Sequence, residues 1–177
     1  AAFPDGIFWV ALGPQMDENS LLAELARFVI ALGGNPQGLT SPAQHSALLA
    51  GLLAGRRALL LLDDCWHPAH ARPFVDALPT TGRCLLTTRR SGVADDLGAA
   101  QRSVPVLDPT PSLALLAAGG DLARQAVAAD QKGAIALAER LGHLPLALEV
   151  AARYLQKQAR SDGPQKALDQ LLAELAE

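Results

Sequence analysis

Leu59-Leu60-Leu61-Leu62-Asp63-Asp64 is the stretch that decides the fold of this chain. Together with Ala58 it forms a continuous apolar run of strand length that ends in two acids. Both faces of such a strand must be covered, which is typical of a parallel sheet flanked by helices. We therefore expect an α/β fold, with further strands and helices on either side of this run.

The neighbouring sequence alternates strand and helix patterns. Strands are predicted at residues 8–12, 58–63, 83–88 and 102–107, and helices at residues 19–32, 42–54, 71–78 and 91–97. Asn19 and Ser20 are expected to cap the first helix, and Ser41-Pro42-Ala43-Gln44 has the form of a capping box with proline at the first helical position. This alternation predicts an α/β layer sandwich with right-handed crossovers.

Beyond Pro109 and Pro111 only helical patterns follow. They cover residues 112–118, 131–141, 145–158 and 165–176. The last of them repeats leucine at helical spacing, a stripe that either docks on the preceding helices or forms a partner surface. We therefore predict two domains, an α/β domain over residues 1–108 and a small all-helical domain over residues 109–177.

Charge and composition exclude several classes of protein. The net charge is −3 and no cluster of Lys or Arg marks a nucleic-acid surface. The longest apolar stretch, residues 47–62, is broken by Arg56 and Arg57, so no membrane segment is expected. The start of the chain has no signal-peptide pattern, so Cys65 and Cys84 are expected to be reduced thiols of a cytoplasmic protein.

The two acids that end the central strand are the strongest candidates for chemistry. In open α/β sheets, ligands bind beyond the carboxyl ends of the strands. A hydrated Mg²⁺ accepts one or two carboxylates and fills its other positions with water and phosphate oxygens. On this interpretation Asp63 supports the metal and Asp64 polarises a water that attacks a γ-phosphate. The alternative is that an apolar strand simply ends in a polar turn.

A second candidate follows the next strand. Gly82-Arg83-Cys84-Leu85-Leu86-Thr87-Thr88-Arg89 ends in two hydroxyls and a guanidinium, so Arg89 should lie at the same sheet edge as Asp63. Arg is suited to holding phosphate oxygens in a fork, although Arg89 could equally be a surface residue paired with Asp95 or Asp96.

A metal cluster is also conceivable after the acids. Cys65, His67 and His70 offer soft ligands, but no fourth ligand is evident. A third segment, Gly142-His143-Leu144-Pro145-Leu146-Ala147-Leu148, is by itself only a sound helix N-terminus.

Taken together, these segments resemble the NB-ARC group of STAND-class signal-transduction ATPases. Phe3 to Val10 is similar to that family's second strand, and Arg57 to Trp66 to its Walker B segment. Gly82 to Arg89 resembles its sensor strand, and Leu144 to Ala147 its GLPLA motif. The four motifs stand in the family's order, and the resemblance runs from about Phe3 to Leu155.

The resemblance implies a role for four residues. Asp63 matches the aspartate that holds Mg²⁺ through water, and Asp64 the acid beside the hydrolytic water. Arg89 matches the sensor arginine that approaches the γ-phosphate, and Pro145 the proline that packs against adenine. The family implies a switch that binds ATP or ADP with Mg²⁺, hydrolyses ATP slowly, and opens for oligomerisation or protein partners.

One motif of the family is missing. No Gly-x-x-x-x-Gly-Lys-Ser/Thr occurs in these 177 residues, so the backbone cradle and the lysine that bind phosphate are absent from them. In the resemblance, the strand that feeds this loop would lie between the strands at Ala58 and Arg83. We therefore expect a P-loop-NTPase-like sheet that lacks its first strand, in a fragment rather than in a degenerate member with a repacked sheet.

Two functions follow from these observations. The first is a nucleotide-dependent switch module, an ATPase in its intact parent and inactive alone without the P-loop. The second is a non-catalytic protein-interaction module that has lost nucleotide binding.

Overall fold

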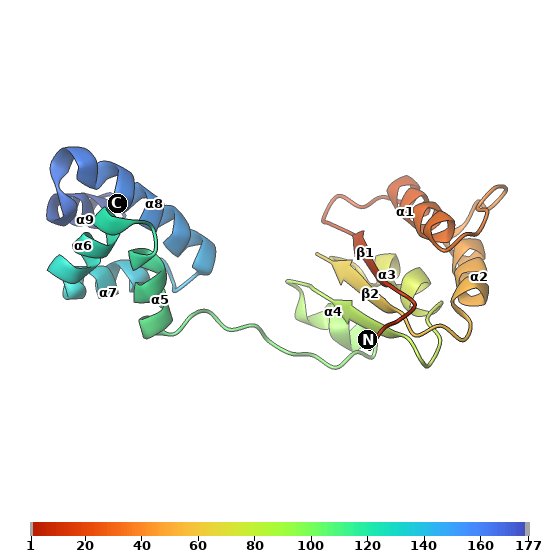
Figure 1. Cartoon of the computed structure of the whole chain (residues 1–177). Helices are drawn as coiled ribbons and strands as arrows, with labels where there is room; N and C mark the ends of the chain where they lie inside the picture. Colours follow the sequence, from red (N-terminus) through yellow and green to blue (C-terminus); the bar gives the residue numbers. More distant parts are fainter. Residues whose placement is uncertain (1, 176–177) are drawn as a thin grey trace. The chain divides into compact units, whose positions relative to one another are not determined.

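A computed structural model describes residues 2–175 of the chain. The chain divides into two compact units, Ala1–Arg102 and Ser103–Glu177, which are drawn in red to green and in green to blue (Figure 1). The first unit contains a parallel sheet with helices, and the second contains helices only. The predicted α/β fold followed by a helical region is confirmed.

The sheet has three parallel strands in the order β1-β2-β3. They are β1 (Ile7–Ala11), β2 (Leu59–Asp63) and β3 (Arg83–Leu86). β2 pairs directly with β3, Leu62 opposite Leu86, so the expectation of a missing strand between them is wrong. The central strand is β2 because it carries the longest apolar run, and β3 has a neighbouring strand on one side only within the described residues.

The helices that the structure describes in this unit are α1 (Glu18–Ala31), α2 (Pro42–Leu53), α3 (Pro68–Val75) and α4 (Ser91–Asp96). Two of them, α1 and α2, begin at side-chain caps. The capping box of Ser41 and Gln44 is confirmed. The cap of α1 is Asp17 rather than Asn19 or Ser20, because the Asp17 side chain accepts a hydrogen bond from the Ser20 amide at 2.7 Å. α3 begins at Pro68, earlier than predicted, since proline is favourable in the first turn.

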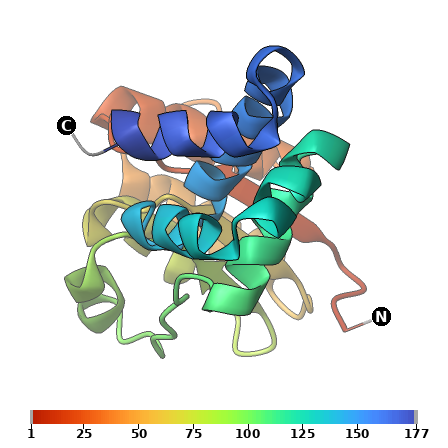
Figure 2. The same ribbon diagram turned by 90° about the vertical axis from the view of Figure 1, so that its left-hand side faces the viewer.

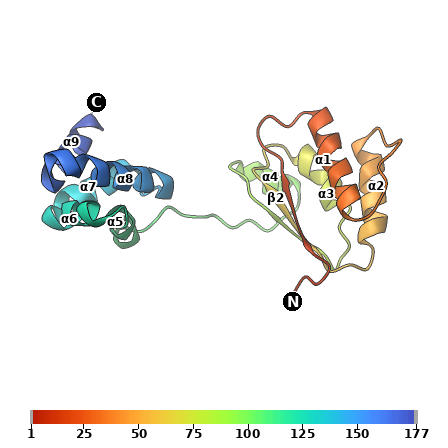
Figure 3. The ribbon, with the colours of Figure 1, turned by 45° about the horizontal axis from the view of Figure 1, so that its top comes forward.

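Within the described residues of the first unit, helices cover one face of the sheet only. Figure 3 shows α1, α2 and α3 on the same side of it. Successive side chains of a strand point to opposite faces. Val10, Leu60 and Leu62 are therefore buried under the helices, with Phe28 and Phe74 in the same core.

The opposite side of the sheet is apolar and exposed. We call it the open face, and it comprises Ile7, Trp9, Leu59, Leu61 and Leu85. Trp9, Leu61 and Leu85 are register partners and form a row across the three strands. Trp9 and Leu85 are each 59% exposed.

The fourth predicted strand, residues 102–107, does not form. This segment belongs to no sheet, and Val104 is 93% exposed. A strand pattern becomes a strand only where a neighbouring edge offers partners, and Pro105 has no amide hydrogen to donate.

The helical unit is built around its longest helix (Figure 2, green to blue). Its helices are α5 (Pro109–Ala117), α6 (Asp121–Ala129), α7 (Gln131–Arg140), α8 (Pro145–Asp162) and α9 (Pro164–Glu174). Leu148 and Leu155 of α8 are fully buried among leucines and alanines of the other four helices. The helix α6 is not among the predicted elements, and its buried side chains are the small Ala123 and Ala126.

The leucine stripe of α9 is divided between core and surface. Leu168 and Leu171 are buried against the other helices, whereas Leu175 is 43% exposed. Ala176, the predicted end of this helix, lies outside the described residues. Within residues 2–175, no helix combines the length and apolar character needed to cross a membrane.

Candidate functional site

Three polar residues meet where β2 and β3 end. Asp63 is the last residue of β2, Asp64 follows it, and Thr87 follows β3. The Thr87 hydroxyl donates to Asp63 Oδ1 at 2.6 Å and accepts a hydrogen bond from the Asp64 amide at 2.9 Å. The prediction that these two strand ends share one edge of the sheet is thereby confirmed.

Asp64 breaks the regular alternation of the strand. Its φ of 52° lies in the left-handed region, which non-glycine residues rarely adopt. Asp63 faces the same side of the sheet as Leu59 and Leu61, and the left-handed turn separates the Asp64 side chain from it. Such local strain persists only where neighbouring groups hold it, and the Thr87 hydroxyl is one of them.

Arg89 reaches the same edge from the β3 side. Its Nε lies 3.8 Å from Asp64 Oδ1, and its side chain is 80% exposed. The suggested alternative, a pairing with Asp95 or Asp96, is not seen among the ion pairs of the described residues. Since an exposed pair at this distance is weak, the guanidinium can turn toward an anionic ligand at little cost.

The loops behind these residues are fastened to each other. The Thr88 hydroxyl donates to the Cys65 carbonyl at 2.7 Å, and Arg90 Nη1 donates to the Trp66 carbonyl at 3.1 Å. The Cys65 amide also donates to the Thr87 carbonyl at 2.9 Å. These bonds join the loop that follows β2 to the loop that follows β3.

The side chains present fit a hydrated divalent cation. Asp63 and Asp64 are both partly accessible, and Asp63 keeps one carboxylate oxygen that has no hydrogen-bond partner among residues 2–175. No group of three His, Cys, Asp or Glu side chains converges anywhere in that range. Two carboxylates without further protein ligands suit Mg²⁺, which keeps several waters and binds phosphate oxygens.

The Cys65, His67 and His70 segment is not a metal cluster in the described structure. The Cys65 thiol donates to the His67 carbonyl at 3.4 Å, and burial raises the pKa of this thiol. The rings of His67 and His70 pack edge to face with centroids 5.3 Å apart. Burial and the neighbouring His67 lower the pKa of His70. These contacts are those of side chains that pack beneath a loop.

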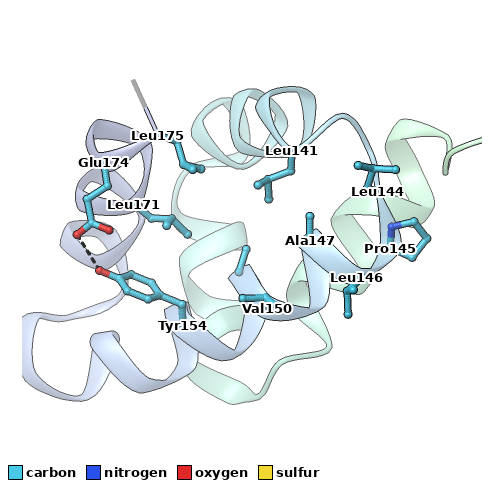
Figure 4. A pocket seen from close by; sticks show the side chains of 11 residues that line it. Leu141, Leu144, Pro145, Leu146, Ala147, Val150, Tyr154, Leu171, Glu174 and Leu175 are labelled. Atoms are coloured by element: carbon cyan, nitrogen blue, oxygen red, sulfur yellow. Dashed lines mark hydrogen bonds between the residues drawn. The ribbon is translucent and has the colours of Figure 1, made fainter. Parts of the chain in front are cut away.

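Pro145 lies in the helical unit, at the first position of α8. It lines an apolar cavity of about 620 Å³ between the N-terminal half of α8 and the end of α9. Figure 4 shows Pro145 and Leu146 toward one end of this cavity and the hydrogen bond between the Tyr154 hydroxyl and Glu174 toward the other. The turn before Pro145 contains His143, whose φ is 54°.

The structure thus gathers three of the four predicted residues. Asp63, Asp64 and Arg89 lie together in the first unit, and Pro145 belongs to the second. Sequence reasoning gave Thr87 no role, although it noted a hydroxyl there. The signal that could have revealed it is position, because Thr87 lies opposite Asp63 once Leu62 is aligned with Leu86.

Residues 2–121 match the NB-ARC domain family. The chain is 34% identical over 160 residues to the regulatory protein AfsR of Streptomyces coelicolor, which covers 88% of this chain and 15% of that protein. It is 31% identical over 157 residues to AfsR of Streptomyces griseus, covering 86% of this chain and 16% of the relative. It is 29% identical over 126 residues to apoptotic protease-activating factor 1 of Danio rerio, covering 65% and 10% of the two chains. The chain therefore spans about a sixth or less of the length of these relatives.

Proposed function

The chain belongs to the NB-ARC domain family of STAND-class signalling proteins, and from this premise we propose that it is the nucleotide-switch module of a regulatory protein. In the intact parent this module binds ATP or ADP with Mg²⁺ and hydrolyses ATP slowly. The observation that carries the proposal is the joined set of Asp63, Asp64 and Arg89 at the carboxyl edge of β2 and β3. That edge is where open α/β sheets bind ligands.

Each residue of the set has a distinct part. Asp63 holds the cation through its water shell, and Asp64 lies beside the water that attacks the γ-phosphate. Arg89 exchanges its weak pairing with Asp64 for the γ-phosphate. Bound Mg²⁺ neutralises part of the phosphate charge. Pro145 packs against adenine. In this module, residues 1–108 are the nucleotide-binding domain and residues 109–177 are the ARC-type helical domain.

The phosphate-binding loop is assigned to another segment of the parent protein. The apolar open face and the unpaired side of β3 support this assignment, because a parallel sheet needs cover on both faces. A strand and helix bearing Gly-x-x-x-x-Gly-Lys-Ser/Thr would pair with β3 and cover Trp9, Leu61 and Leu85. The 177 residues alone are therefore inactive in ATP hydrolysis, and in the cytoplasm the parent uses the nucleotide to control self-association or partner binding.

The same open face favours a second candidate function. Trp9 and Leu85, each 59% exposed, form with Leu61 an apolar strip of the kind that binds proteins. A non-catalytic module that has lost the nucleotide would use this strip for interaction. The two candidates differ in whether Asp63 matters for nucleotide binding.

A titration with a fluorescent ATP analogue and Mg²⁺ separates the two functions. We expect the parent protein to bind with micromolar affinity, and Asp63→Ala to abolish that binding. Asp95→Ala removes the same charge from the exposed surface of α4 and serves as the matched control. Binding lost on Asp63→Ala but kept on Asp95→Ala rejects the interaction-module function. A parent that binds no nucleotide, or one whose binding is indifferent to Asp63, rejects the switch.

A further inference from the structure

Among residues 2–175, Thr87 is the one side chain that hydrogen-bonds to both members of the acidic pair. Its Oγ1 lies 2.6 Å from Asp63 Oδ1 and 2.9 Å from the Asp64 amide nitrogen. The only proton of the hydroxyl goes to the carboxylate, and a lone pair receives the amide hydrogen. One oxygen atom therefore satisfies an acid of β2 and the backbone of the next residue at the same time.

The position of this hydroxyl is fixed from its own main chain. The Thr87 amide donates to the Leu62 carbonyl at 2.9 Å, and the Thr87 carbonyl accepts from the Cys65 amide at 2.9 Å. Thr87 thus continues the parallel ladder one residue beyond β3 and is held on both sides of the peptide. Because threonine is branched at Cβ, few χ1 rotamers remain to it.

The two acids are therefore held in different environments, Asp63 beside the Thr87 hydroxyl and Asp64 beside the Arg89 guanidinium. Asp63 gives one oxygen to the hydroxyl and keeps the other available. Asp64 is held in its left-handed turn, and its carboxylate faces the Arg89 guanidinium at 3.8 Å. Two adjacent carboxylates that both turned to the same point would repel each other. The Thr87 hydroxyl binds the side chain of Asp63 and the backbone amide of Asp64, and so it keeps the two carboxylates apart.

We propose that Thr87 is the positioning residue of this site, whose hydroxyl orients the Asp63 carboxylate and fixes the backbone turn of Asp64. This inference rests on the proposed function, since it treats the acids as the cation-binding and water-activating groups. Groups that orient metal-binding carboxylates contribute strongly to metal affinity, although they do not touch the metal.

The test compares three variants of the full 177-residue chain. Thr87→Val removes the hydroxyl and keeps the shape, and Thr87→Ser keeps the hydroxyl and removes the methyl group. Thr88→Val is the matched control, because the Thr88 hydroxyl bonds the Cys65 carbonyl and contacts neither acid. Thermal unfolding of each variant establishes that it folds before the comparison is made.

Two measurements are made on each variant. The first is amide hydrogen exchange of Asp64, which by NMR should quicken about fivefold or more in Thr87→Val and remain near the wild-type rate in Thr87→Ser and Thr88→Val. The second is Mn²⁺ binding, followed by paramagnetic water relaxation, in which Thr87→Val should raise the Kd about tenfold or more. Thr87→Ser should restore most of the affinity.

The outcomes distinguish this inference from the proposed function. If Thr87→Val behaves like Thr88→Val in both measurements, Thr87 positions nothing. If the wild-type chain and its parent bind no Mn²⁺ while Thr87→Val still frees the Asp64 amide, the nucleotide function fails and the positioning role stands.

Discussion

The hydroxyl of Ser112 lies 2.9 Å from Nδ1 of His143 and joins the first turn of α5 to the turn between α7 and α8. Ser112 is completely buried, and its hydroxyl also donates to the Asp108 carbonyl at 2.9 Å. His143 is held with φ 54°, and its carbonyl accepts from the Leu107 amide at 3.1 Å. This pair therefore anchors the turn that precedes Pro145 to the start of α5.

Ser112→Ala should destabilise the helical unit. The change leaves the His143 ring without its buried partner, which costs about 1–3 kcal/mol in the free energy of unfolding. Urea unfolding followed by circular dichroism measures the loss. Ser161→Ala, at an exposed hydroxyl near the end of α8, is the control and should change stability by less than about 0.5 kcal/mol. Equal effects of the two changes would contradict a structural role for the pair.

Gly119→Ala should destabilise the same unit for a different reason. A Cβ at Gly119 would clash with the Ala152 carbonyl oxygen, a backbone atom that cannot move aside cheaply. Overpacking of this kind costs about 1–3 kcal/mol. Gly51→Ala is the counterpart, because the helical Gly51 has open space around it. We expect that change to stabilise the α/β unit by up to about 1 kcal/mol. Chemical unfolding of both variants shows whether the two signs differ.

Gln156 acts as a cap for a helix other than its own. Its Oε1 accepts from the Leu122 amide at 2.9 Å and from the Ala123 amide at 3.2 Å, at the start of α6. Gln156→Ala should cost about 0.5–2 kcal/mol of stability, as the loss of an N-cap does. Gln156→Glu keeps an accepting oxygen at this position and adds a negative charge that a helix N-terminus favours. It should therefore be clearly more stable than Gln156→Ala in thermal unfolding, and a reversed order would refute the capping role.

Arg89→Ala should separate nucleotide recognition from stability. Arg89 is exposed, and its ion pair with Asp64 is long at 3.8 Å. Removal of Arg89 should therefore change the unfolding free energy by less than about 1 kcal/mol. In the intact parent it should weaken the binding of ATP about tenfold relative to that of ADP, since the contact proposed for Arg89 is to the γ-phosphate. Arg90→Ala removes a neighbouring guanidinium that bonds the Trp66 carbonyl and should leave the ATP to ADP ratio unchanged. Isothermal titration with both nucleotides checks the ratio.

Acid should weaken the α/β unit partly through His70. Burial lowers the pKa of His70 below its ordinary value of 6.5 in the folded state. The unfolded chain then binds a proton in a range where the folded chain does not, so stability falls as the pH drops from about 6.5 toward the lower folded pKa. His70→Gln should reduce this slope, while both proteins behave alike above about pH 7.5. Urea unfolding across this range measures the slopes, and identical slopes would exclude His70.

The sequence predicts the features of this chain that local chemistry determines. The apolar run into Asp63, the Ser41 capping box and the proline at the start of α8 are all local, and each is found as predicted. Sheet order is not local, and the missing strand was placed between β2 and β3, where the structure has direct pairing. Residues 102–107 have a strand pattern but no partner edge, so the pattern alone gives the wrong answer.

In the candidate site too, the features set by local sequence were predicted and those set by strand pairing were not. Asp63, Asp64 and Arg89 could be chosen from residue type and from the ends of strands. The role of Thr87 depends on a register that aligns it with Asp63, and the left-handed turn of Asp64 has no counterpart in the sequence. The α6 helix was missed because alanine gives a weak apolar pattern, although Ala123 and Ala126 are completely buried.

The open face gives the chain an optical reporter of its own assembly. The sequence has only two tryptophans, and Trp9 stands at the β1 end of the exposed row that it forms with Leu61 and Leu85. An indole that is 59% exposed emits as a solvated chromophore, and covering it shifts the emission to shorter wavelength. The binding of any segment or protein to this face is therefore detectable, without a label, as a shift of the intrinsic fluorescence to shorter wavelength. With Trp66 replaced by phenylalanine, the remaining signal belongs to that face alone.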